Sequence, residues 1–229
     1  MVRRKRRNIK IILSLILFLL GLFIFVFPAI TNYLYNRSVY KKEKKFEEVI
    51  KNNDFESLYQ LLKEENNSLY QNKQHTFINQ KVSFEEPLID LKKYGLEDNI
   101  IGYLEIPSID ITLPIYLGAS NSNMKLGAVH LTGTTYPIGG MNTNSVIAAH
   151  RGFYKTKMFR YIDRIKIGDK LYIKNFKETL VYKAINMDII DSKAINKLII
   201  QENRDMITII SCHPYPFNYQ RYVVYFERI

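Results

Sequence analysis

Residues 206–226 read MITIISCHPYPFNYQRYVVYF, two β-like runs joined by a proline-punctuated turn. The first run ends at Cys212, the only cysteine among the 229 residues, and the second begins at Arg221. Two strands that leave one turn lie side by side, so the thiol and the guanidinium are expected to be neighbours. A third apolar run, residues 145–149, ends at His150. Because strand-end loops hold reactive side chains on a rigid frame, these three residues are candidate catalytic groups.

From residue 99 onward, short β-rich runs alternate with turn residues, a pattern that predicts about eight strands. The expected strands lie near residues 100–106, 111–116, 128–131, 145–150, 170–174, 180–190, 206–212 and 221–227. Short helices are expected at residues 157–165 and 192–201. Many short strands with few helices favour a closed or partly closed β-barrel over a doubly wound sheet. The expected fold class is therefore mainly β.

Positive charge is concentrated at the start of the chain. The formal net charge is +11, and residues 1–45 contain eleven Lys or Arg against the single Glu43. A nucleic-acid-binding protein usually spreads its basic residues over a folded face. No nucleic-acid partner is therefore expected.

The basic cluster borders a 20-residue uncharged segment, residues 11–30, that is rich in Leu, Ile and Phe. A helix of that length spans about 30 Å, the thickness of a bilayer core. The alternative, a cleaved signal peptide, usually has an apolar core of only about 7–15 residues. We therefore expect a retained single-pass anchor at residues 11–30, with residues 1–10 as a basic cytoplasmic tail and the residues from 31 onward outside the cell.

Three further regions follow the anchor. Residues 31–70 carry apolar residues at three- and four-residue steps, which predicts a helical stalk. Residues 71–98 are mostly polar and are expected to form a linker or a lid. Residues 99–229 are expected to form the catalytic β-barrel domain.

The sequence resembles the sortases, membrane-anchored cysteine transpeptidases of Gram-positive bacteria. Residues 208–212 resemble their Thr-Leu-x-Thr-Cys signature, and Arg221 follows the cysteine by nine positions, as in the family pattern. Residues 145–152 resemble the strand that carries the catalytic histidine. Residues 102–107 with 113–116, and residues 127–134, resemble the pilin-polymerising class C branch most closely.

The resemblance implies an eight-stranded sortase-like barrel and a division of labour in the site. Cys212 would attack the carbonyl of a Leu-Pro-x-Thr-Gly-like sorting signal, His150 would protonate the leaving amine, and Arg221 would stabilise the developing oxyanion. The thioacyl enzyme would then be resolved by an amine, either a pilin lysine or the peptidoglycan bridge. The implied partners are surface proteins or pilins that carry a sorting signal, and no cofactor is implied.

Class C sortases often carry two features that this sequence does not reproduce plainly. One is a second transmembrane segment near the C-terminus, whereas the sequence here stops at Ile229, just after the last expected strand. The other is a lid with an Asp-Pro-aromatic motif, for which residues 84–88 are the comparable stretch. A lid is compatible with this sequence, but the residue that would anchor it is not identified.

Five residues are candidate substrate contacts. His130 and Thr134 lie in the class C-like segment and are expected to shape the pocket, and Ser211 precedes the nucleophile. Tyr215 and Tyr219 belong to the turn and either line a groove for an apolar peptide or pack the loop on the barrel. No metal is expected, because the sequence has no His-Glu-x-x-His spacing and no cysteine cluster.

Three alternative functions are also compatible with parts of the sequence. The first is a sortase of another class that attaches proteins to peptidoglycan. The second is a papain-like cell-wall peptidase, in which the nucleophile ordinarily precedes its histidine and opens a helix, whereas here His150 comes before Cys212 and Cys212 ends a strand. The third is a non-catalytic pilin or adhesin, which would carry a sorting signal of its own.

Overall fold

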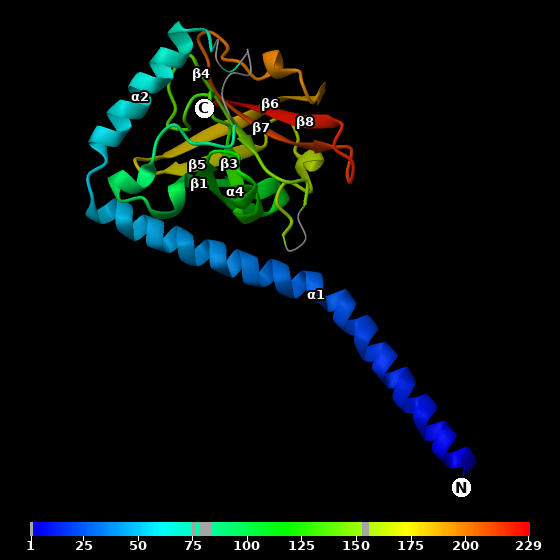
Figure 1. Ribbon diagram of the computed structural model, residues 1–229. Helices are drawn as coiled ribbons and strands as arrows, with labels where there is room; N and C mark the ends of the chain where they lie inside the picture. The colour runs from blue at the N-terminus through cyan, green and yellow to red at the C-terminus, as the bar shows by residue number, and fades with distance from the viewer. Residues whose placement is uncertain (1, 75–76, 78–83, 153–155) are drawn as a thin grey trace.

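In the computed structural model of the protein, which describes residues 2–74, 77, 84–152 and 156–229, eight strands close into one barrel. The strand order around the barrel is β1-β2-β3-β4-β7-β8-β6-β5 (Figure 1). The strands are β1 (Ile100–Ile106), β2 (Ile111–Leu117), β3 (Ala128–His130), β4 (Thr143–Ala148), β5 (Lys170–Asn175), β6 (Thr179–Asp191), β7 (Asp205–His213) and β8 (Gln220–Arg228). The eight-stranded barrel predicted from the sequence is confirmed.

Helices lie before and between the strands. The α-helices are α1 (Val2–Asn52), α2 (Glu56–Gln71) and α4 (Asn121–Leu126). The described 3-10 turns are η1 (Leu91–Tyr94), η2 (Glu97–Asn99), η3 (Pro107–Ile109), η4 (Ile162–Arg164) and η5 (Ile195–Lys197). Only single turns, η4 and η5, therefore form where the sequence suggested helices at 157–165 and 192–201, so that expectation was wrong.

Tertiary hydrogen bonds explain why these two segments are not helical. In the first, the Phe159 amide donates to the His150 carbonyl at 3.1 Å, which draws the segment back toward β4. In the second, the Ile200 amide donates to the Gln74 side chain at 2.7 Å, and the Leu198 carbonyl accepts from the Asn144 amide group at 3.0 Å. Backbone groups that would serve a helix are thus used by distant residues.

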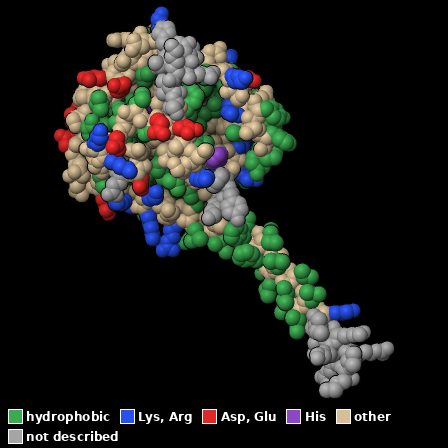
Figure 2. Space-filling view, viewed as in Figure 1, with side chains coloured by type: hydrophobic (Ala, Val, Ile, Leu, Met, Phe, Trp, Pro, Cys, Tyr) green, Lys and Arg blue, Asp and Glu red, His purple; other side chains and the backbone are tan. Residues whose placement is uncertain are grey.

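The first half of α1 is apolar and exposed. The helix is long and apolar enough to cross a membrane, with a mean hydropathy of 3.0 in its best window. Figure 2 shows its hydrophobic side chains extending away from the globular part of the molecule. Pro28 lies inside α1, and Figure 1 shows that the helix changes direction about midway. Proline removes one helical hydrogen bond and is a common cause of such bends.

The second half of α1 packs on the barrel. Val39 and Phe46 are buried, and the Phe46 ring meets the Tyr103 ring edge-on with centroids 5.5 Å apart. Lys174 on β5 forms an ion pair with Glu43 at 2.9 Å. One continuous helix therefore carries both the apolar segment and a part of the domain core.

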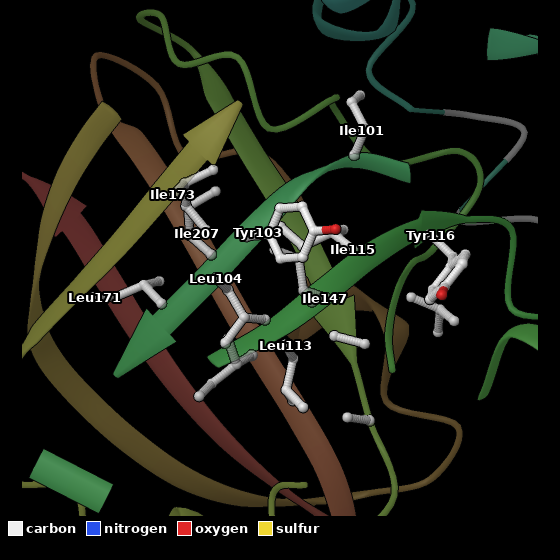
Figure 3. Close-up of a cluster of buried hydrophobic side chains, with 14 of the residues drawn as sticks. Ile101, Tyr103, Leu104, Leu113, Ile115, Tyr116, Ile147, Leu171, Ile173 and Ile207 are labelled. Carbon is white, nitrogen blue, oxygen red and sulfur yellow. The ribbon is translucent and has the colours of Figure 1, made fainter. Parts of the chain in front are cut away.

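Alternation along each strand divides the apolar residues between two clusters. Leu104, Ile115, Ile147 and Ile207 are among the residues of the barrel interior (Figure 3). A second cluster on the outer face of β4, β7 and β8 contains Val146, Met206, Ile210 and Val223. Because side chains alternate along a strand, Cys212 faces the same way as Ile210, toward the outer cluster.

A buried amide joins the β6–β7 connection to the barrel. Asn144 is fully buried, and its Nδ2 donates to the carbonyls of Leu198 and Ile199 at 3.0 and 3.2 Å. Its Oδ1 accepts from the Thr208 hydroxyl at 2.7 Å. One side chain thus fixes the path of the connection over the outer face of the sheet.

We expect Asn144→Ala to lower the free energy of unfolding by about 1–3 kcal/mol, because buried polar groups would lose their partners. Denaturant unfolding of the detergent-solubilised full chain measures this change. The matched control is Asn53→Ala, at an exposed residue after α1, which should stay within about 0.5 kcal/mol of the parent. Equal stability of the two variants would contradict the role assigned to Asn144.

Candidate active site

Cys212 and Arg221 face each other across two hydrogen-bonded strands. In the antiparallel pairing of β7 with β8, Cys212 lies opposite Arg221, and Ile190 on β6 lies opposite Arg221 on its other side. Directly opposed residues in an antiparallel pair point to the same face. The sulfur, the guanidinium and the Ile190 side chain therefore form one row, and Cys212 is a partly exposed free thiol.

His150 reaches the same sheet edge through β4. Strands β4 and β7 are parallel, and Ala148 lies opposite Ile210 at the last pair of the ladder. Two bonds continue the contact: the Ala149 amide donates to the Ile210 carbonyl at 3.3 Å, and the Ser211 hydroxyl donates to the Ala149 carbonyl at 2.8 Å. Extending this register by two residues brings His150 beside Cys212. The three candidate residues thus lie at the same edge of the sheet, where β4 and β7 end and β8 begins.

The backbone after β4 holds His150 in place. Its carbonyl oxygen accepts from the Gly152 amide at 2.8 Å and from the Phe159 amide at 3.1 Å. The side chain is half-buried, and this burial lowers the pKa of His150, because the charged imidazolium loses solvation.

Cys212 and Arg221 line a cavity of about 610 Å³, a size typical of ligand-binding pockets. Its floor is the outer face of the sheet, and part of its wall is the β6–β7 connection. Most of the lining from these elements is apolar and includes Ala148, Ile190, Ala194, Ile195, Leu198 and Ile210. The cavity therefore suits an extended apolar peptide, and the Cys212 thiol lies in its wall.

Two aromatic residues from the segment that precedes the barrel cover one side of this cavity. Phe77 is almost fully buried, and its ring lies 5.6 Å from the Phe84 ring. The Phe84 carbonyl accepts from the Ala119 amide at 2.6 Å, and the Glu86 carbonyl accepts from the Thr132 hydroxyl at 2.9 Å. Residues 75–76 and 78–83 of the expected linker or lid lie outside the described part of the chain.

The structure places His130 and Thr134 beneath the β3–β4 connection, outside the described lining of the cavity. Both are buried, and the Thr134 hydroxyl lies 3.1 Å from Nε2 of His130. His130 stacks on Tyr136 with ring centroids 5.1 Å apart. Burial lowers the pKa of His130 to about 4, so the ring is neutral at pH 7. These contacts support the loop that flanks β4.

The structure brings Ser211 to the cavity, but its hydroxyl is used by the Ala149 carbonyl. Tyr215 lies in a different cleft, between the β7–β8 turn and α1, where its hydroxyl accepts from Arg160 at 3.2 Å. Tyr219 stacks on Phe217 at 6.2 Å and is exposed. Among the described residues, the two tyrosines are thus separate from the row of Cys212 and Arg221.

Several lining residues were not singled out from the sequence. Ile190, Ala194 and Leu198 are ordinary apolar residues, and only the folding of the β6–β7 connection over the sheet gives them this position. Phe77 and Phe84 lie far from the signature motifs in the sequence. Arg151 directly follows His150 and is buried, which the sequence did not signal for an arginine.

The Sortase domain family matches residues 104–229, more than half of the chain. The chain belongs to the sortase family. Among curated relatives, it is 27% identical over 133 residues to Sortase D of Bacillus subtilis (strain 168), covering 56% of this chain and 63% of that protein. It is 26% identical over 117 residues to Sortase A of Listeria monocytogenes, covering 51% and 50%. The match thus spans about half to two thirds of these relatives.

Solved class C sortases are among the structural neighbours of this sortase, as the resemblance predicted. Streptococcus agalactiae Sortase C1 superposes with a TM-score of 0.69 at 27% identity, covering 83% of this chain and 95% of that chain. Streptococcus pneumoniae Sortase C gives 0.64 at 31% identity, covering 82% and 95%. Clostridium perfringens SM101 sortase C gives 0.62 at 31% identity, covering 82% and 98%.

The imidazoles of His130, which is buried, and of His150, which is half-buried, should titrate at lower pH than an exposed histidine. Burial favours the neutral ring, so the midpoint of His130 should lie near pH 4 and that of His150 below the reference value of about 6.5. NMR titration of the imidazole C–H resonances, assigned with His130→Gln and His150→Gln, measures both midpoints. A midpoint above 6.5 for His150 would contradict the assigned desolvation.

Proposed function

We propose that this sortase is a membrane-anchored cysteine transpeptidase that cleaves a Leu-Pro-x-Thr-Gly-like sorting signal and transfers the acyl part to an amine. The observation that carries the proposal is the row of Cys212 and Arg221 beside an apolar cavity, with His150 at the end of the neighbouring strand. This arrangement supplies a nucleophile, a cation and a proton donor at one carbonyl group.

In the first step, the Cys212 thiolate attacks the carbonyl carbon before the scissile bond. The S–C bond forms, and the C–N bond then breaks as the leaving amine takes a proton from the His150 imidazolium. Arg221 stabilises the negative charge on the carbonyl oxygen. Its Nη1 donates to the carbonyls of Asn218 and Gln220 at 2.6 and 2.8 Å, which holds the guanidinium at the start of β8.

In the second step, a neutral amine attacks the thioacyl carbon. The new C–N bond forms, the amine proton passes to His150, and Cys212 leaves as a thiolate. Attack by water in place of the amine releases a free acid. The choice between transfer and hydrolysis therefore depends on whether the amine reaches the thioester before water.

We assign a pilin lysine as the acceptor because the structural neighbours include class C sortases, one of whose published descriptions refers to pilin substrate specificity. Two alternatives to a pilin lysine acceptor can be distinguished by their products. One is attachment to an amine of peptidoglycan, and the other is hydrolysis without transfer. Each gives a product of different mass.

The proposal places the barrel outside the cell. The apolar half of α1 would span the membrane, with the basic residues before Ile11 on the cytoplasmic side. Because the second half of α1 is packed on β5 through Glu43 and Lys174, the barrel would stay close to the membrane surface. Substrates that are themselves held in the membrane would then meet the site at a fixed height.

Replacement of Cys212 by Ala should abolish cleavage of a sorting-signal peptide, a loss of at least about 10³-fold, because no other group can form the thioester. Mass spectrometry of reactions with a lysine side-chain amine, a glycine-rich amine or water alone identifies the acceptor. An unchanged melting temperature is the control for folding. Parent-like cleavage by the variant would refute the nucleophile, and free acid with every amine would favour the hydrolase.

The aromatic cover also leads to a prediction for activity. If Phe84 must leave its contact with Phe77 before a peptide enters, Phe84→Ala should raise kcat/KM for a short sorting-signal peptide by roughly 2- to 10-fold, the range expected for loss of an aromatic pair. Leu88→Ala, at an exposed residue of the same segment, is the matched control. An equal or lower rate for the Phe84 variant would argue against gating.

A further inference from the structure

The guanidinium of Arg151 contacts strands β7 and β8 close to Cys212 and Arg221. Arg151 directly follows His150 and is 7% exposed. Its Nη1 donates to the carbonyl oxygen of Cys212 at 3.4 Å and to Nδ1 of His213 at 3.3 Å. The guanidinium also lies over the Tyr222 ring, 5.5 Å from its centroid. Tyr222 is the residue after Arg221.

The same side chain is held from the opposite direction by the loop that follows β4. Nε of Arg151 donates to the carbonyl of Arg160 at 3.3 Å, and Nη2 pairs with the carboxylate of Asp163 at 2.9 Å. A guanidinium presents its donors in a rigid planar fork, so all these partners are fixed relative to one another. The β4 loop, β7 and β8 are therefore joined at one point.

Alternation along the strands separates Arg151 from the reacting atoms. Cys212 and Arg221 face the cavity, so His213 and Tyr222 face the other side of the sheet edge. His213 and Tyr222 meet there, with ring centroids 5.9 Å apart. Arg151 contacts both of them and is not among the described residues of the cavity lining. It can thus act on the site by positioning the chain, without contact with the reacting atoms.

The contact also gives His213 a structural partner. An arginine can only donate, so Nδ1 of His213 accepts in this contact. His213 thus supports the guanidinium from the side of the sheet edge that faces away from the cavity. This position argues against a role for His213 as a second proton donor beside Cys212.

We propose that Arg151 is a positioning residue that sets the separation between the His150 imidazole and the Cys212 sulfur. The inference rests on the proposed function, because it concerns the same thiol and imidazole. Asp163 is half-exposed, so water can hydrate its carboxylate when the guanidinium is removed, and an ion pair of this kind is a weak source of stability. The effect of Arg151 on geometry is thus separable from its effect on folding.

The experiment uses the detergent-solubilised full chain and the variants Arg151→Met, Arg151→Lys and Asp163→Asn. Arg164→Ala is the matched control, because Arg164 is exposed in the same loop and stacks only on its neighbour Tyr161 among the contacts described. Three quantities are measured: melting temperature, kcat and KM for a sorting-signal peptide with an amine, and the pH dependence of Cys212 alkylation by iodoacetamide. Alkylation reports on one site, since the chain has a single cysteine.

We expect Arg151→Met to lower kcat by about 10²-fold with KM within about threefold of the parent, because a displacement of about 1 Å at the reacting groups has such an effect. Arg151→Lys should not restore kcat, because a single ammonium cannot reach Cys212, Arg160 and Asp163 together. Asp163→Asn should give a smaller loss. A kcat within twofold of the parent for a folded Arg151→Met, or full rescue by Lys, would overturn the proposal.

Alkylation separates this inference from the proposed function. In the parent, the pH profile should contain an inflection from His150 that His150→Gln removes, and Arg151→Met should remove it as well. That result supports the positioning role even if no sorting-signal peptide is cleaved. If Arg151→Met retains the inflection, the positioning role of Arg151 is overturned, whatever the activity. If Arg151→Met does not fold, the Asp163→Asn variant decides: a parent-like kcat and a parent-like inflection would overturn the positioning role. Loss of either would support the positioning role.

Discussion

The parallel pairing of β4 with β7 is the constraint on which the site depends. It places two strand ends that are far apart in sequence at the same edge of the barrel, with Ala148 opposite Ile210 as the last pair. A shift of one residue in β7 would turn the Cys212 side chain away from the cavity, and a shift of one residue in β4 would displace His150. The hydrogen bond from Ser211 to the Ala149 carbonyl continues the pairing past the ladder and fixes its end.

Buried polar side chains fix the paths of the connections between the strands. Asn144 holds the β6–β7 connection through two carbonyls, and Gln74 joins that connection to the Gly133 carbonyl on the other side. Arg151 joins the loop after β4 to β7. Each is almost fully buried and hydrogen-bonded, which gives it high geometric specificity, since an unpaired polar group at the same place would be costly.

The long helix α1 joins a segment that is apolar enough to span a membrane to the domain that contains the site. Its apolar half has the length and composition of a span, and its second half contributes Val39 and Phe46 to the core. The same helix therefore belongs to both parts of the molecule. In the proposed arrangement, an anchor that is part of the core would limit how far the row of Cys212 and Arg221 can move from the membrane surface, in contrast to an anchor joined through a flexible linker.

The sequence by itself determined the eight strands, the apolar segment of α1 and the row of Cys212 and Arg221, because period-two alternation, a 20-residue uncharged run and a turn between two strands are local patterns. Only the tertiary structure decided that His130 and Thr134 are buried supports, that Tyr215 lies in another cleft, and that residues 157–165 and 192–201 contain only single 3-10 turns. It also decided the contacts of Arg151. These outcomes depend on which distant carbonyls and rings a side chain meets, and no local pattern contains that information.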